Sequence, residues 1–246
     1  MQLERLGHVA LLKINAGKAN AIGPAWLDGM SHLLDELGDA RAVVVTGYEG
    51  FFSAGLDLPS LLGLDRPAIH SFIEKFNATM LRLFDVPVPM VAAVNGHAIA
   101  GGCVLAMQAD WRMMTDRASK IGLNEVAIGI GLPTVVVETL RCQVPPATLV
   151  PIALEGKLVG PAEALRLGLV HEVVPAEEVV DRALARAQEL AALPSAAVRQ
   201  VKHALRHAVS ELIRANDVRD TARWVETWFS TEGQTHLQAA VARIKK

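Results

Sequence analysis

Glu125 is the only acid in an apolar, glycine-containing segment, residues 120–131. Burying a carboxylate among apolar side chains is costly unless the group is paired or neutralised, and such burial raises its pKa toward the range of an effective general base. The local sequence leaves two alternatives open, because Glu125 could face solvent or pair with an arginine. Proton transfer is the chemistry that this residue could perform if it is buried.

A pair of glycines, Gly101 and Gly102, supplies a second chemical feature. The pair follows an apolar run at residues 90–94, which has the pattern of an interior strand, and a turn of small residues, and it opens a predicted helix. Glycine lets a ligand approach the backbone, and the first N–H groups of a helix have no intrahelical partner. Such a turn suits an anion or a polarised carbonyl. Taken alone, the pair favours a tight turn that packs a strand against a helix.

A second loop, residues 48–58, follows another apolar strand pattern at residues 42–46. Gly55 would let the chain turn so that the N–H of Leu56 points outward to a ligand, while Asp57 could fix the loop by accepting backbone hydrogen bonds. The alternative is an ordinary loop in which Asp57 caps a helix.

The elements between these loops predict that they meet. Residues 67–84 have apolar side chains at helical spacing, and the helix they predict joins the strand at 42–46 to the strand at 90–94. A strand, helix and parallel strand form a right-handed crossover, which places the N–H groups of Leu56 and Gly101 at the same edge of a sheet.

The overall composition excludes several classes of protein. The chain has 246 residues, 51% of them hydrophobic, and a formal net charge of −2. This composition is that of a folded globular α/β protein, and the charge offers no footprint for nucleic acid. Cys103 and Cys142 are too few for a disulfide framework, and no apolar run is long enough to span a membrane. We therefore expect a cytoplasmic protein with no nucleic-acid or membrane partner.

The rest of the chain is predicted to form a hairpin around residues 7–8, a helix over 24–37, a strand at 111–115, helices over 134–142 and 145–154, an extended piece at 157–159, a helix over 161–168 and a strand at 169–174. From residue 176 onward the pattern is helical, with breaks at Pro194 and near Ser230. We expect a core over residues 1–194 and a helical oligomerisation region over residues 195–246. The apolar residues of the second region, which include Leu205 and Trp228, need another surface to cover them.

Three motifs together resemble the crotonase (enoyl-CoA hydratase/isomerase) superfamily: residues 52–58 (Phe-Ser-Ala-Gly-Leu-Asp-Leu), residues 95–103 and residues 121–125 (Ile-Gly-Leu-Asn-Glu). Their order and spacing match the family, and the late segment at 161–174 extends the resemblance over nearly the whole chain. Within the superfamily the motifs look most like the Δ3,Δ2-enoyl-CoA isomerase branch. The resemblance implies a spiral of ββα turns with a C-terminal helical region that assembles trimers, often paired into hexamers.

The resemblance also implies a substrate and a site. The substrate would be an acyl-CoA thioester, and the N–H groups of Leu56 and Gly101 would form an oxyanion hole on its carbonyl. The residues implied to line the CoA loop are Ala54, Gly55, Asp57 and Leu58. Lys18, in the loop at residues 15–20, is placed where its ammonium group could reach the CoA phosphates. No metal or redox cofactor is implied.

Position 104 distinguishes among the reactions of the family. Hydratases in this family use two glutamates, one at the position of Glu125 and one at the position that Val104 occupies here. A valine cannot transfer a proton, whereas moving a double bond needs one base that takes a proton from C2 and returns it to C4. The pattern favours an enoyl-CoA isomerase. Hydration, thioester hydrolysis, decarboxylation, C–C bond formation and a catalytically silent acyl-CoA-binding or assembly role remain alternatives.

Other reactive residues have plainer explanations. Cys103 lacks an evident base and is expected to be a buried apolar group, and His97 to be packed or solvent-facing. His203 and His207 share a helix face, but no nearby acid or cysteine completes a metal site. Asp110 is expected to be structural. Glu138 is open: if it faces the acyl chain, Glu125 is not the only base.

Overall fold

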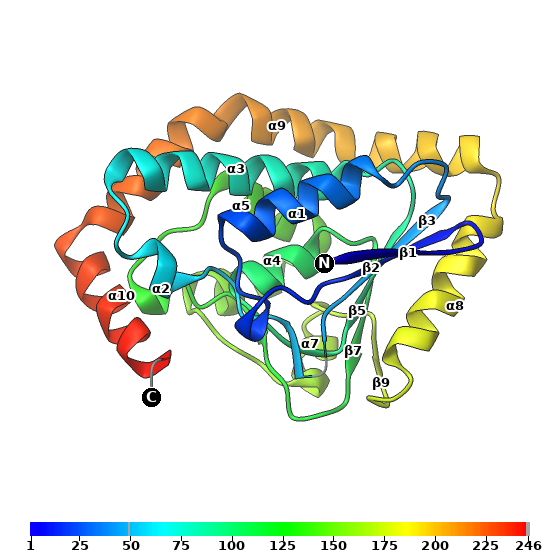
Figure 1. Ribbon diagram of the computed structural model, residues 1–246, viewed down its shortest axis with the longest axis horizontal. Coiled ribbons are helices and arrows are strands. Elements are labelled where there is room, and N and C mark those ends of the chain that lie inside the picture. Colours follow the sequence, from blue (N-terminus) through cyan, green and yellow to red (C-terminus); the bar gives the residue numbers. More distant parts are fainter. Residues whose placement is uncertain (49, 245–246) are drawn as a thin grey trace.

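The computed structural model describes residues 1–48 and 50–244 (Figure 1). Their strands form two sheets. The larger sheet contains, in spatial order, β1 (Gln2–Leu6), β2 (Val9–Lys13), β3 (Ala42–Thr46), β5 (Met90–Val94), β7 (Trp111–Thr115) and β9 (Glu172–Val174). The smaller sheet contains β4 (Gly50–Ser53), β6 (Gly96–Ile99) and β8 (Ile121–Gly122). The predicted α/β class is confirmed by these mainly parallel sheets and the helices described next.

The helices account for most of the remaining chain. They are α1 (Pro24–Asp35), α2 (Leu58–Leu61), α3 (Arg66–Phe84), α4 (Gly101–Met107), α5 (Thr134–Gln143), α6 (Pro146–Leu149), α7 (Pro161–Arg166), α8 (Val179–Ala192), α9 (Ser195–Phe229) and α10 (Thr231–Ile244). Short turns of other helix types are η1 (Lys18–Asn20), η2 (Val126–Ile128) and the π-helical η3 (Val150–Leu154). Among the described helices, none is both long and apolar enough to cross a membrane.

The larger sheet is parallel except for the β1–β2 hairpin, which was predicted. Every residue of β3 and β5 is buried, because helices cover both faces of the sheet. Helix α8 covers one face with small residues such as Ala183 and Ala187, and α1, α3 and α4 lie over the other (Figure 1). The chain thus folds as helix, sheet and helix layers around two apolar cores.

The sheets are linked by a repeated ββ unit. The pairs β3–β4, β5–β6 and β7–β8 each place one strand in the larger sheet and the next in the smaller sheet. Helices α3 and α4 follow the first two pairs. The smaller sheet is parallel throughout, so its three strands end at one edge.

The smaller sheet was not predicted. Residues 48–58 were expected to be a loop and residues 95–100 a turn, but these segments contain β4 and β6. Both strands are only four residues long and begin with glycine, so they carry neither the alternation nor the β-branched run that marks a strand. Their pairing is fixed by contacts that are distant in sequence.

Several predicted bounds also change. Helix α1 ends at Asp35, and the strand expected over 169–174 is confined to β9. The single helix expected over 145–154 is instead α6 followed by a π-helical turn that contains Pro151, which has no N–H to donate. The expected extended piece at 157–159 forms only an isolated bridge between Ile121 and Val159.

The C-terminal helices are partly covered by the rest of the chain. Trp228 and Leu237 are fully buried in the core cluster, so the surface expected to cover Trp228 is the rest of the chain itself. Leu205 and Leu212, on the outer face of α9, remain 72% and 45% exposed. Helix α9 begins at Ser195, and the proposed division of the chain at that point stays a prediction.

Candidate active site

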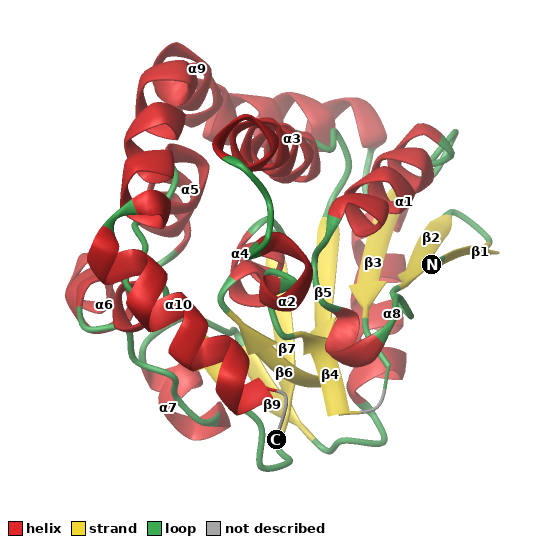
Figure 2. Ribbon diagram, turned by 60° about the vertical axis from the view of Figure 1, so that its left-hand side comes forward, coloured by secondary structure: helices red, strands yellow, loops and turns green. Residues whose placement is uncertain are grey.

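A cavity of about 480 Å³ opens where the strands of the smaller sheet end. Its walls come from η1, the β4–α2 segment, the end of β6, the turn after β8 and the last residues of α10. Figure 2 shows α10 folded back toward β4 and β6. The lining residues singled out from the sequence are Lys18, Ala54, Leu56, Asp57, Leu58 and Glu125. The three candidate motifs therefore meet in one place, because parallel strands end at the same edge of a sheet.

The loop that carries Lys18 is fixed by a buried asparagine. The Asn20 side chain accepts a hydrogen bond from the Ala16 N–H at 2.8 Å and donates to the carbonyls of Ile14 and Phe52. The Ala54 N–H donates to the Ala19 carbonyl at 2.9 Å. These bonds hold the loop against β4, so that Lys18 stands at the rim of the cavity.

Gly55 and Gly101 lie against each other behind the cavity wall. Gly55 has φ of +87°, and a Cβ atom there would lie 2.9 Å from the Gly101 nitrogen. Within residues 1–48 and 50–244, no hydrogen bond uses the backbone N–H of Leu56 or Gly101 as a donor. Both amides are thus unpaired among the described residues, as expected from a turn and a helix N-terminus; Leu56 lines the cavity, whereas Gly101 lies behind it.

The backbone before α4 is strained. Ala100 has φ of +51° and ψ of −121°, a combination that costs an L-residue energy and that persists only where its surroundings impose it. A Cβ atom on Gly102 would lie 2.1 Å from the Ser53 carbonyl oxygen, so this glycine is a packing requirement. The packing interpretation of the glycine pair therefore holds for Gly102, while the Gly101 N–H remains free.

Asp57 is a helix cap. Its side chain accepts a hydrogen bond from the Ser60 N–H at 3.4 Å at the start of α2. The alternative interpretation of this loop is confirmed in that respect. The carboxylate also lies in the cavity wall, where it holds the turn that presents the Leu56 amide.

Glu125 is buried in the cavity wall and is 7% exposed. No ion pair to it exists among the described residues, and its Oε2 atom is buried without a hydrogen-bond partner there. The two alternatives, a solvent-facing or arginine-paired glutamate, are therefore wrong. Burial raises the pKa of Glu125 to about 7, and the backbone amides of Glu125 and Asn124 offset part of that rise. A base with this pKa is half ionised at neutral pH.

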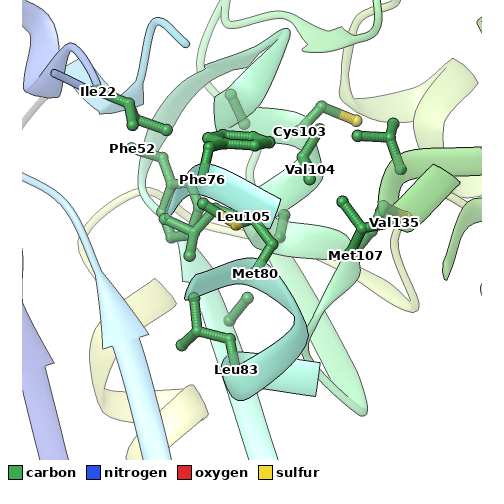
Figure 3. Packing of buried hydrophobic residues seen from close by; sticks show 14 of the residues in the cluster. Ile22, Phe52, Phe76, Met80, Leu83, Cys103, Val104, Leu105, Met107 and Val135 are labelled. Atoms are coloured by element: carbon green, nitrogen blue, oxygen red, sulfur yellow. The ribbon is translucent and has the colours of Figure 1, made fainter. Parts of the chain in front are cut away.

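Two other positions bear on the number of bases. Val104 is 1% exposed and packs in the apolar core with Phe76 and Val135, and Figure 3 shows it within this group. Glu138 lies outside the Glu125 cavity, in a separate hollow between α5 and α9, and pairs with Arg141 at 3.1 Å. Glu138 therefore does not line the cavity that contains Glu125.

The remaining candidates are structural. Cys103 is fully buried, and burial together with the nearby charge of Glu125 raises the pKa of its thiol to about 12. Asp110 pairs with Lys202 and Arg206 at 2.6 Å each, as expected for a structural acid. His97 accepts a hydrogen bond from the Lys120 backbone N–H.

His203 and His207 stack on each other on α9, with ring centroids 4.8 Å apart. In the part of the chain that the structure describes, no three His, Cys, Asp or Glu side chains are grouped to hold a metal ion.

Sequence reasoning did not find the part of the site that α10 supplies. Ala240, Arg243 and Ile244 of α10 line the cavity together with Ile128 and Ile130. The apolar spacing of α10 predicts a packed face but not the element against which it packs. Asn124 also lines the cavity, and the motif at residues 121–125 assigns a role to Glu125 but none to the neighbouring amide.

The fold and this cavity define a crotonase-fold protein with one buried carboxylate and two backbone amides that are unpaired among the described residues. A model of the enoyl-CoA hydratase/isomerase family matches residues 4–240, and the chain belongs to this family. It is 31% identical to human mitochondrial enoyl-CoA delta isomerase 1, over 97% of this chain and 80% of that protein.

Solved structures agree with this assignment. That of human mitochondrial Δ3,Δ2-enoyl-CoA isomerase superposes with a TM-score of 0.94 at 30% identity, covering 99% of this chain and 97% of the other. An enoyl-CoA hydratase from Mycobacterium ulcerans gives a TM-score of 0.85 at 28% identity, over 90% and 97% of the two chains. Relatives thus include both isomerases and hydratases.

Proposed function

We propose that this protein is a Δ3,Δ2-enoyl-CoA isomerase that uses Glu125 as its single proton-transfer group. One observation carries the proposal. Of the two carboxylates in the described cavity wall, Asp57 is used as a helix cap, and Glu125 is buried with a free oxygen. One base is sufficient to shift a double bond, whereas hydration requires acid–base help at two positions.

The two free amides are proposed to bind the thioester carbonyl of the substrate. Removing a proton from C2 of a 3-enoyl thioester creates a dienolate, whose negative charge collects on this oxygen. The N–H groups of Leu56 and Gly101 would stabilise that charge more than the neutral ground state. One such donor typically lowers a barrier by about 3–4 kcal/mol.

Glu125 would move the proton. The C2–H bond breaks, the proton passes to the carboxylate, and the electron pair enters the dienolate. The carboxyl O–H bond then breaks as the C4–H bond forms, which leaves the double bond between C2 and C3. The shift is redox-neutral and needs no metal or redox cofactor.

The relatives named as hydratases leave hydration as the main alternative. Val104 weighs against it, because an apolar core side chain occupies the position at which family hydratases carry their second glutamate. Hydrolysis and decarboxylation, like a silent acyl-CoA-binding role, remain as outcomes that an assay must distinguish.

The nucleotide end of the substrate would meet positive charge. Lys18 of η1 and Arg243 of α10 are both exposed and both line the cavity. We infer that they attract the CoA phosphates. Ala54, Gly55 and Leu58 would complete the wall of the CoA loop.

We also propose a homotrimer, or a dimer of trimers. This part of the proposal is supported by exposed apolar residues on one face of α9, where Val201, Leu205 and Leu212 are 52%, 72% and 45% exposed. Burial of such a row against other copies would remove it from water.

Incubation with 3-hexenoyl-CoA and, separately, 2-hexenoyl-CoA tests the reaction. We expect double-bond migration with neither hydrated product nor free CoA. Glu125→Gln should abolish migration while acyl-CoA binding persists, and Glu138→Gln, in the separate hollow, serves as the matched control. Full turnover by Glu125→Gln, or hydration as the main reaction, would refute the assignment.

A further inference from the structure

The Asn124 amide is a polar group in the cavity that the proposed reaction leaves unused. Its Oδ1 atom is buried and, among the described residues, has no hydrogen-bond partner. The Oε2 atom of the next residue, Glu125, is in the same condition. Both residues line the cavity, and of its described lining residues only these two have such buried, unpartnered atoms.

Asn124 Oδ1 and Glu125 Oε2 can form a hydrogen bond with each other only when the Glu125 carboxyl group is protonated. An ionised carboxylate oxygen and an amide oxygen both accept hydrogen bonds and cannot bond to each other. A protonated carboxyl group has an O–H that can donate to an amide oxygen. Leaving a buried polar atom unpaired is costly, so a donor that appears on Glu125 would relieve the cost at Asn124.

Resting on the proton shift proposed above, we propose that Asn124 is a positioning residue for Glu125. Its Oδ1 accepts a hydrogen bond from the carboxyl O–H after the proton leaves C2 and until it reaches C4. The asparagine gains and loses no proton; the bonds that break and form are those at C2, C4 and the carboxyl oxygen.

This role has two physical consequences. A hydrogen bond to the neutral acid favours the protonated form, which makes Glu125 a stronger base. It also gives the proton a partner inside the protein, which slows its exchange with water. The surrounding titratable or charged groups are Cys103 on α4 and, around the cavity, Lys18, Asp57 and Arg243.

Proton retention tests the role during turnover. A 3-hexenoyl-CoA deuterated at C2 is converted in ordinary water, and the deuterium recovered at C4 is measured. In Asn124→Leu, which removes the acceptor at similar size, we expect a roughly tenfold lower kcat, a nearly unchanged KM and less deuterium at C4. Asn124→Val provides a second apolar variant, and Asn216→Leu, outside the cavity, is the control.

Infrared titration tests the same bond without turnover. The carboxyl C=O band of Glu125 is identified from its loss in Glu125→Gln, and its pKa is followed in wild type and Asn124→Leu. We expect the pKa to fall by about one unit, although a more apolar neighbour alone would raise it. An unchanged or higher pKa, or unchanged deuterium retention, overturns the role of Asn124. A lower pKa in a protein that shifts no double bond would overturn the isomerase function and leave the hydrogen bond standing.

Discussion

The backbone of Gly55 lies so close to that of Gly101 that a Cβ atom on the first would stand 2.9 Å from the nitrogen of the second. The same atom would lie 2.8 Å from the Ile99 carbonyl oxygen and 2.8 Å from the Ala100 Cβ. The two loops therefore set the separation of the Leu56 and Gly101 amides through a direct backbone contact, which any side chain at position 55 would disrupt.

Replacing this glycine should impair catalysis. Gly55→Ala must hold alanine at a φ of +87° and push the two loops apart. We expect kcat/KM for 3-hexenoyl-CoA to fall about 10²–10³-fold, the effect of losing one oxyanion donor. Gly63→Ala is the matched control, because a Cβ atom there meets nothing within 4 Å. Circular dichroism verifies folding, and wild-type turnover by folded Gly55→Ala would contradict the assigned role of the amides.

The meeting of these loops could be predicted from the sequence, but the sheet that brings them together could not. The apolar runs at β3 and β5 and the helical period of α3 predict one crossover, and that crossover places both loops at one edge. β4 is stabilised by parallel pairing with β6, and β6 pairs in parallel with β8 on its other side. Such pairing depends on contacts between distant segments, which a local pattern does not record.

The position of α10 illustrates the same limit. Its helical period predicts the helix, but the close approach of Gly129 to Gly233, with a Cβ on Gly129 only 3.0 Å from the Gly233 Cα, decides where it docks. That contact sets α10 over the turn after Glu125 and brings Arg243 to the cavity rim. Glu125 was singled out as the one acid of an apolar segment, and its burial agrees with that pattern.

Isomerase activity should depend on a single ionisation near neutral pH. Burial raises the pKa of Glu125 to about 7, and the base must be ionised to accept the C2 proton. As pH falls below about 7, kcat/KM should therefore decrease tenfold per unit, because this parameter follows the free enzyme. A plot of kcat/KM from pH 5 to 9 measures the pKa. If kcat/KM instead decreased with a pKa near 4.5, the carboxyl group of Glu125 would be exposed to solvent.

The same burial should cost stability above neutral pH. A carboxyl pKa that rises from 4.5 to about 7 on folding gives a stability contribution that is present below pH 4.5 and lost as pH rises through 7. The full effect is about 3 kcal/mol at 1.36 kcal/mol per unit. Glutamine does not titrate, so Glu125→Gln should gain about this much over wild type between pH 4.5 and pH 8.5. Urea unfolding at both pH values measures it; a pH-independent difference would contradict burial of the ionised group.

Positive charge at the rim should affect substrate affinity more than turnover. Lys18→Ala and Arg243→Ala should each raise KM about two- to fivefold with little change in kcat, since each removes an exposed charge from the proposed path of the CoA phosphates. The effect should shrink at high ionic strength. Lys13→Ala is the control, because Lys13 is exposed on β2 and pairs with Glu4. Equal KM values at low salt would exclude these side chains from phosphate binding.

Asp110 should stabilise the packing of α9 against the core. It accepts hydrogen bonds from the Met90 N–H at 2.7 Å and from Lys202 at 2.6 Å, and it pairs with Arg206. Both cations are more than 90% buried, and burial lowers the pKa of Lys202 to about 8 against the attraction of Asp110.

Asp110→Ala leaves those two buried cations without their carboxylate. We expect a loss of about 3 kcal/mol in the free energy of unfolding at pH 6, because an uncompensated buried charge is costly. The loss should shrink as pH rises toward 9. Without Asp110 the pKa of Lys202 falls further, so the amine loses its positive charge at a lower pH in the folded variant than in the unfolded chain. Glu178→Ala, which breaks the exposed pair with Arg182, should cost about 0.5 kcal/mol or less. Equal costs for the two substitutions would show that the buried cluster contributes no more than a surface pair.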